Sequence, residues 1–560
     1  MNLLQPLKEV QLDSETRGLD CHTKALLTLQ LGCTEFQIVF DWTTLTKEEK
    51  YELKEYLESD RLFIGHNLMF DLTFLYKQNI WPNHIYDTMI AEQLIYLGFP
   101  RVLTTDLVNE LGIEFPGYEY IDTNDKGLPL DKPYWELSYS LQATAKRRIN
   151  INIDKTVRGK IINDGLTEEV VVYAGGDVMW LEKIKEEQLK ELERQNLVKA
   201  CKFECEFIKS LAYVKYCGIH MDPVLWSNKM KKDTKDLNDA IKILNAFVID
   251  LNNKGFIYRY ATDKKELERI QALGFERCPE KDTDVECWKK DISGMFAHIN
   301  NQMSLFEEYN ETGPVCDINW SSSQQVIRLF ELLGIQVKTF DKKTKKEKKS
   351  IEEKLLSPQQ DKFPIIKEFL KYQGAAKVVS TYGENWLNAI NPKTGRIHVE
   401  LHSIGTDTSR ISSGGGVYKL NLTNLPHDPV TRSCFTAEEG NVWLSCDYTG
   451  QESYLTASVA NDKTMLEVLT SGRDLHSEVA RAAWPDMLGN LSDKEIKTKY
   501  HDLRFQAKGI EFGIKLNNFV HLFGNLEEKT LGEFGESPTN EDNTEPSVGL
   551  TSYEGVTTNS

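Results

Sequence analysis

The sequence predicts an α/β protein, and three observations lead to this fold class. Val10 and Leu12 alternate with polar residues as on a half-buried strand, and apolar runs at Ala25–Leu31 and Phe36–Phe40 predict the next strands of the same sheet. Residues from about 182 to 216 have the pattern of a long amphipathic helix. A length of 560 residues predicts three or four domains of about 150 residues each. The protein is therefore expected to be a multidomain chain with a sheet near its N-terminus.

Composition narrows the class of protein. No stretch approaches the ~20 apolar residues of a membrane span, and no secretory signal precedes the first strand, so we expect no membrane partner and a cytoplasmic location. The ten cysteines lack zinc-ligand spacing and are interpreted as reduced thiols. The net charge of −18 neither supports nor excludes a DNA partner, because acidic metal sites and a locally basic DNA path can coexist. The basic run Lys342–Lys349 is equally consistent with DNA contact and with a solvated loop.

The first strand carries two carboxylates at a meaningful spacing. Asp13 and Glu15 are two residues apart, so on a strand both point to one face, while Val10 and Leu12 point to the other. Mg²⁺ and Mn²⁺ prefer carboxylate and water oxygens, so a site for these ions needs several acids at one point. A single pair of this kind is usually a solvated face, and further acids are needed to support a metal site.

Two later segments each carry an acid four residues after another polar side chain, which is a helical spacing. Asn67 and Asp71 are four residues apart, as are Tyr173 and Asp177, and this spacing stacks side chains on one face of a helix. Each pair alone is typical of an exposed helix. Three motifs in this order, one on a strand and two on helices, make a catalytic arrangement the better interpretation. Asp87, in the segment Tyr86–Ala91, is interpreted as structural.

These three motifs resemble the signature of the DEDDy 3′–5′ exonucleases in their proofreading form. The resemblance implies an RNase H-like domain and a two-metal mechanism with Mg²⁺ or Mn²⁺ ions about 4 Å apart. It implies metal ligands at Asp13, Glu15, Asp71 and Asp177. Tyr173 would hydrogen-bond the attacking water, and Asn67 would contact the substrate, a single-stranded 3′ end.

After residue 395 a second resemblance appears, to the family A DNA polymerases. Thr406–Ser413 is similar to the segment of that family that contacts the minor groove of the primer–template, with Arg410 as the contact. Trp443–Glu452 resembles palm motif A, an apolar strand that ends at an aspartate. The resemblance implies that Asp447 ligates both catalytic ions, that Tyr448 borders the incoming dNTP and that Glu452 excludes a ribose 2′-hydroxyl.

The fingers motif of the same family has a counterpart in Arg504–Gly513. Spacings of four place Arg504, Lys508 and Phe512 on one helical face. The resemblance implies that the two cations grip the triphosphate, that Phe512 stacks near the base and that His476 touches phosphate. The segments between about residues 196 and 395 resemble the thumb and early palm of the family.

The family pattern stops soon after this motif. Leu516 stands where a tyrosine is expected, and the second palm carboxylate motif, His-Asp-Glu, is absent. Residues 525–560 are rich in Glu, Thr, Asn, Ser and Gly and are expected to be disordered. The sequence is therefore interpreted as the front part of a polymerase, phage-like in starting at the exonuclease. Its tail is attributed to intron read-through or to a split gene.

The predicted organisation has four parts. An exonuclease domain covers residues 1–195, a mostly helical thumb and start of palm residues 196–395, a partial palm and fingers residues 396–524, and a non-family tail residues 525–560. The leading prediction is a DNA polymerase with 3′–5′ proofreading whose own chain retains mainly exonuclease activity. The alternatives are a stand-alone exonuclease, the N-terminal half of a split polymerase that needs a second polypeptide, and a non-enzymatic DNA-binding subunit.

Overall fold

The computed structural model describes residues 1–111, 117–123, 128–153, 167–260, 263–278, 287–299, 314–340, 347–406, 408–448 and 450–510. The chain separates into two compact units, Met1–Trp443 and Leu444–Ser560, and each is treated by itself. Among the described residues, no helix combines the length and apolarity that crossing a bilayer requires.

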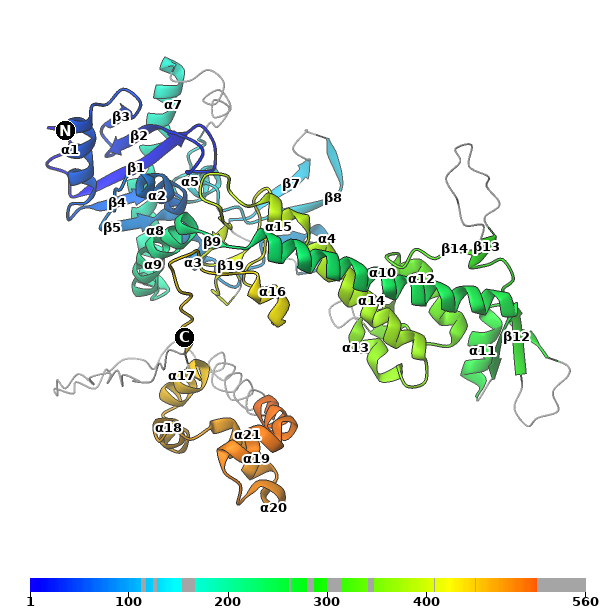
Figure 1. The fold of residues 1–560 in the computed structure, drawn as a ribbon. Helices are drawn as coiled ribbons and strands as arrows, with labels where there is room; N and C mark the ends of the chain where they lie inside the picture. Colours follow the sequence, from blue (N-terminus) through cyan, green and yellow to red (C-terminus); the bar gives the residue numbers. More distant parts are fainter. Residues whose placement is uncertain are drawn as a thin grey trace. The chain divides into compact units, whose positions relative to one another are not determined.

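A five-stranded sheet organises the N-terminal part of the first unit (Figure 1). Its strand order is β3-β2-β1-β4-β5. The first three strands pair antiparallel, and β1, β4 and β5 pair parallel. The bounds are β1 Glu9–Thr16, β2 Leu26–Gly32, β3 Gln37–Asp41, β4 Leu62–Gly65 and β5 His84–Asp87. The three strands expected from the apolar pattern are thus confirmed, each within a residue or two.

Helices pack around this sheet and build the main core. They are α1 (Lys47–Leu57), α2 (Leu68–Lys77), α3 (Thr88–Ile95), α5 (Leu141–Ile149), α7 (Glu168–Val178), α8 (Leu181–Arg194) and α9 (Val198–Cys217). Val10 and Leu12 are fully buried among their apolar residues, as the strand alternation predicts. A smaller sheet of order β6-β8-β7 lies beside α4; these elements are β6 Val102–Thr104, α4 Thr105–Leu111, β7 Glu119–Thr123 and β8 Pro129–Glu136.

The middle of the first unit is built on two long helices that pack together, α10 (Pro223–Lys254) and α14 (Pro364–Thr381) (Figure 1). Small sheets and short helices surround one end of the pair. They comprise β10 Phe256–Tyr260, α11 Lys264–Ala272, β11 Glu276–Arg277, β12 Cys287–Asp291, β13 Ala297–Ile299, β14 Pro314–Cys316, α12 Ser323–Leu333, β15 Lys338–Phe340, β16 Glu347–Lys349, α13 Glu353–Leu356 and a 3₁₀ turn at Ser357–Gln359. The expectation of a mostly helical region missed these sheets, because their strands are too short to show a clear period of two.

The first unit ends in short elements that include the start of the predicted palm. They are α15 Glu384–Asn388, β17 Arg396–Ile397 paired with β9 Ile219–His220, β18 Leu401–His402 paired with β19 Ser412–Ser413, and α16 Pro429–Ser433. The predicted long helix over residues 182–216 is two helices instead. Asn196 takes a left-handed φ of 58° between α8 and α9, which ends the first helix.

The second unit is helical where it is described. It contains α17 Gln451–Val459, α18 Lys463–Thr470, α19 Leu475–Ala483, α20 Pro485–Leu488 and α21 Asp493–Lys499, and residues 501–510 are also helical. The strand expected to end at Asp447 is wrong. Residues 441–448 have neither helix nor strand, because no strand of the described chain pairs with them to satisfy their backbone groups. The predicted disordered tail, residues 525–560, lies outside the described residues.

Candidate active site in the N-terminal sheet

The two carboxylates of the first motif share one face of the central strand. Asp13 pairs with Gln30 of β2, and Glu15 pairs with Thr28. Gln30 in turn pairs with Val39 of β3. Directly opposed residues of antiparallel strands point to the same face, so Asp13, Glu15 and Val39 all lie on one side of the sheet.

Helix α7 covers this same side. A Cβ built on Gly175 of α7 would lie 3.6 Å from Gln37 Cβ and 4.0 Å from Val39 Cγ2. The backbone N–H of Leu181, at the start of α8, donates to Gln11 Oε1 at 3.0 Å and anchors the following helix to β1. Positions 173 and 177 therefore belong to a helix packed on the Asp13 face. The side chains of Tyr173 and Asp177 lie outside the described residues.

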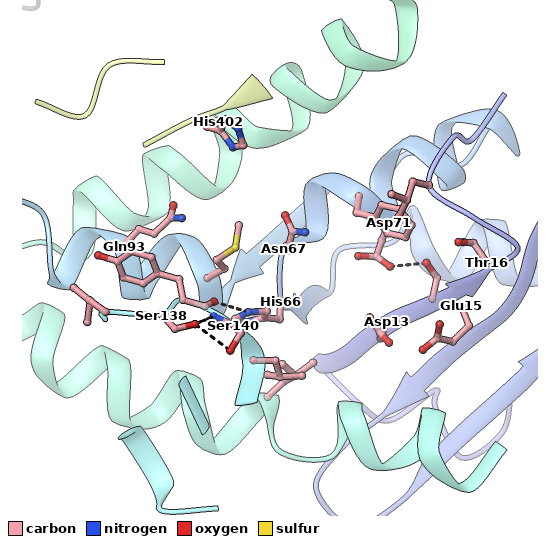
Figure 2. A pocket seen from close by; sticks show the side chains of 18 of the residues that line it. Asp13, Glu15, Thr16, His66, Asn67, Asp71, Gln93, Ser138, Ser140 and His402 are labelled. Carbon is pink, nitrogen blue, oxygen red and sulfur yellow. Dashed lines mark hydrogen bonds between the residues drawn. The ribbon is translucent and has the colours of Figure 1, made fainter. Parts of the chain in front are cut away.

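Asp71 reaches the central strand from α2. Ser14 points to the face opposite Asp13, and its Oγ donates to Asp71 Oδ1 at 2.5 Å (Figure 2). Asp71 is 3% exposed. Burial raises the pKa of Asp71 to about 7, the Ser14 hydrogen bond opposes the rise, and the charges of Asp87 and Glu15 add to it. This carboxylate is thus buried close enough to Glu15 for their charges to repel.

These three carboxylates line one cavity of about 650 Å³, together with Asn67. Asn67 is the N-cap of α2 and takes a left-handed conformation, with φ 61° and ψ 45°. It is thus not in the helix with Asp71, as the spacing of four had predicted, but the two side chains still share the cavity (Figure 2).

Residues that the sequence analysis did not single out complete the cavity. His66 is held at both ring nitrogens, Nδ1 at 2.8 Å from Thr88 Oγ1 and Nε2 at 3.0 Å from the Tyr139 carbonyl. The Arg101 guanidinium lies over the Tyr139 ring, 5.2 Å from its centroid. Further lining comes from Phe70, Met89, Gln93, Ser138, Ser140 and His402. His66 and Phe70 stand next to Asn67 and Asp71 in the second motif and so had a local sequence signal. The others come from other segments that the fold brings together.

The donor set suits a hard divalent cation in kind. Carboxylate oxygens are the ligands that Mg²⁺ and Mn²⁺ prefer, and a cation beside Asp71 would offset its repulsion by Glu15. Within the described ranges, no group of three His, Cys, Asp or Glu side chains is already gathered as a metal cluster.

The residues assigned to nucleotide binding have a different environment. Asp447 and Tyr448 lie in the irregular segment 441–448, where Tyr448 is 78% exposed. Glu452 is in the first turn of α17 and is also exposed. In the first unit, Arg410 is exposed, and its backbone N–H donates to Thr406 Oγ1 at 3.0 Å.

The predicted phosphate-binding residues lie on helices of the second unit. Arg504 makes a bidentate pair with Asp474, with Nε–Oδ2 2.7 Å and Nη2–Oδ1 2.8 Å. His476 is in the first turn of α19, which Asp474 caps, and Lys508 is exposed. Phe512 lies outside the described residues. The pair with Asp474 holds Arg504 against the residue that caps α19.

Two family models match this chain. Residues 1–193 match the model described as 3′-5′ exonuclease, and residues 290–516 match the model described as DNA polymerase family A. A solved structure, the POL domain of Pol1 from M. smegmatis in complex with DNA primer-template and dNTP, covers 91% of this chain and 69% of its own, with a TM-score of 0.59 at 15% identity. That likeness is one of fold.

Curated relatives extend along most of the chain. It is 23% identical to DNA polymerase I of Borreliella burgdorferi over 91% of this chain and 45% of the relative. It is 24% identical to the DNA polymerase of Escherichia phage T5 over 90% of this chain and 51% of the relative. A shorter match, to the thermostable DNA polymerase I of Thermus aquaticus, is 33% identical over 36% of this chain and 23% of the relative. The chain thus spans about half the length of the long-matching relatives.

Proposed function

We propose that this chain removes nucleotides from DNA 3′ ends with divalent metal ions, since residues 1–193 match the model described as 3′-5′ exonuclease and residues 290–516 match the model described as DNA polymerase family A. The observation that carries the proposal is the gathering of Asp13, Glu15 and Asp71 on one cavity, beneath the helix that bears positions 173 and 177.

The roles follow from the chemistry of phosphodiester hydrolysis. Two Mg²⁺ or Mn²⁺ ions would supply a hydroxide nucleophile and neutralise charge on the phosphoryl oxygens. Asp13, Glu15, Asp71 and Asp177 would hold them. Tyr173 would orient the attacking water, as the DEDDy form of the family requires.

The walls of the cavity fit the end of a single strand. The guanidinium of Arg101 offers a positive charge to a phosphate, and Phe70 and Tyr139 offer aromatic faces on which bases stack. Asn67, the N-cap of α2, offers its side-chain amide for hydrogen bonds to the terminal nucleotide. A flexible single strand can enter such a cavity, whereas a duplex must first fray at its end.

For the polymerase part we propose the family roles with one restriction. Asp447 would ligate metal, Tyr448 and Glu452 would border the sugar of a dNTP, and Arg410 would contact the primer–template minor groove. The triphosphate would be held by His476, Arg504 and Lys508, with Phe512 near the base. Because residues 443–448 of motif A form neither helix nor strand, and the sequence holds no His-Asp-Glu motif, we propose that this polypeptide alone extends primers poorly or not at all.

The test uses a 5′-labelled primer annealed to a longer template, with Mg²⁺, with and without dNTPs. An Asp13→Ala/Glu15→Ala variant is the control. We expect shortening without dNTPs that the variant loses, and no extension with dNTPs. Retained shortening in the variant would reject the assigned exonuclease site.

The same assay separates the alternatives. Template-directed extension by the purified chain would reject the restriction on polymerisation. Extension that appears only after a second polypeptide is added would identify a split polymerase. Primer binding without either activity would indicate a DNA-binding subunit.

A further inference from the structure

Asp87 is a buried carboxylate outside the predicted catalytic set. It is the last residue of β5 and is 1% exposed. Its Oδ1 accepts backbone N–H groups of Met89 at 2.8 Å and of Ile90 at 3.3 Å, so that it caps α3. This is the ordinary role of an N-cap aspartate.

The same carboxylate also binds the start of a second helix. The N–H of Asn67 donates to Asp87 Oδ1 at 3.0 Å, and the N–H of Leu68 donates to Oδ2 at 2.7 Å. Asn67 is the N-cap of α2, but its side chain makes no capping hydrogen bond. Asp87 therefore caps α2 from another strand, which leaves the Asn67 amide for the cavity.

A second link joins the same two segments. Gly65, the last residue of β4, is paired with Asp87 of β5. Thr88 Oγ1 donates to the Gly65 carbonyl at 3.0 Å and lies 2.8 Å from His66 Nδ1. One short stretch, residues 87–88, thus fixes both the turn into α2 and the start of α3.

Both helices deliver residues to the candidate site. Asp71 comes one turn after the α2 cap, and Met89 and Gln93 come from α3. A helix start that moves carries the side chains of its first turn with it, so the place of the Asp71 carboxylate depends on the bonds made by Asp87.

We propose that Asp87 is a positioning residue for the exonuclease site, holding α2 so that Asp71 stays at the cavity that Asp13 and Glu15 also line. This inference rests on the proposed function and adds a residue to it. Asp87 acts through Asp71, because its two oxygens are directed to four N–H donors and the described lining of the cavity does not include it.

The test compares Asp87→Asn with a matched cap variant. Asp222 caps α10 and accepts N–H groups of Val224 at 2.8 Å and Leu225 at 2.9 Å, so Asp222→Asn controls for the loss of the negative charge of a capping carboxylate, since Asn still caps a helix. Thr88→Val removes the second link and keeps the side-chain shape, which provides a milder variant if Asp87→Asn fails to fold. Each full-length protein is assayed for Mn²⁺ binding by calorimetry, for single-turnover exonuclease rate and for melting temperature.

We expect Asp87→Asn to weaken Mn²⁺ binding and to slow the exonuclease by about 10- to 100-fold, the usual cost of losing a group that orients a metal ligand. Thr88→Val should move both quantities in the same direction by less, and Asp222→Asn should change only the melting temperature. In an Asp71→Asn background, Asp87→Asn should have little further effect, because the residue through which it acts is already altered.

Two results would overturn the inference. If folded Asp87→Asn had unchanged Mn²⁺ binding and an unchanged exonuclease rate, Asp87 would be a purely structural cap. If Asp87→Asn did not fold, the same unchanged values in Thr88→Val would lead to the same conclusion. A full additional loss in the Asp71→Asn background would show that Asp87 acts independently of Asp71. If the unmodified chain proved to have no exonuclease activity, the Mn²⁺ titrations would still decide the role of Asp87, so the two proposals fail separately.

Discussion

The acids of the N-terminal sheet and Asp447 are assigned the same chemistry, yet the structure gives them opposite surroundings. Asp13 and Glu15 stand on a strand paired on both sides, and Asp71 is buried against Ser14. Asp447 lies in an irregular segment whose Leu444 is 83% exposed. A carboxylate is thus held in place where its strand is paired with neighbouring strands. A sequence motif alone does not provide that support.

The sharpest way to break this comparison is to remove one acid from each region. Asp71→Asn should lower the exonuclease rate by more than about 100-fold, since a proposed ligand should matter more than the groups that orient it. Asp447→Asn should leave that rate within about twofold. Degradation of a labelled single-stranded oligonucleotide measures both variants. A large loss in Asp447→Asn would mean that the two regions are coupled.

Hydrogen exchange should reveal the same contrast in backbone protection. Amide protons of β1 lie in a buried sheet, so their exchange requires opening of that sheet and should be slowed by orders of magnitude. Residues 441–448 have no strand partner in the described chain and should exchange within seconds. Mass spectrometry of peptides from the two segments measures both. Strong protection of residues 441–448 would show that they are paired in solution.

A glycine beside the N-terminal site, compared with one in α14, tests how closely that site is packed. A Cβ on Gly65, just before α2, would lie 2.2 Å from Leu68 Cδ2, whereas a Cβ on Gly374, within α14, has no neighbour within 4 Å. Gly65→Ala should lower the free energy of unfolding by about 1–3 kcal/mol through overpacking and should also slow the exonuclease. Gly374→Ala, in an open helical position, should raise it by about 0.5–1 kcal/mol. Denaturant unfolding checks both signs; equal effects would contradict the packing argument.

The sequence predicted the N-terminal region well because its signals are local. Asp13 and Glu15 share a face since side chains alternate on a strand, and the apolar runs around them mark the neighbouring strands. Tyr173 and Asp177 fall within a helix as their spacing predicts. The catalytic roles of these residues remain predictions.

What the sequence left out depends on contacts between distant segments. Arg101, Tyr139 and His402 join the cavity through folding alone. No pattern of spacing signals that Asp87, on β5, caps α2. The interpretation of Asp87 as structural and not catalytic stays a prediction. The prediction of a strand ending at Asp447 was wrong, because a strand forms only where other strands pair with it, and none does so in the described chain.

The smallest expected effect concerns the second unit and its own charged pair. Burial alone would raise the pKa of Asp474, but hydrogen bonds from Arg504 and Ser477 hold it well below its ordinary value of 3.8. The folded state therefore binds fewer protons there than the unfolded state. The resulting stability is fully present at neutral pH and is lost as pH falls below about 4.

Asp474→Asn should accordingly destabilise the second unit by about 1 kcal/mol at pH 7, a modest value because the pair borders solvent. The variant should also be less sensitive to acid than the unmodified chain. Unfolding curves from pH 3 to 7, followed by exchange of peptides from α19, measure this difference. If the two proteins lost stability in parallel on acidification, the Asp474–Arg504 pair would not form in solution, and Arg504 would already be available to a triphosphate. The outcome therefore also decides whether the proposed binding of a triphosphate by Arg504 has to compete with Asp474.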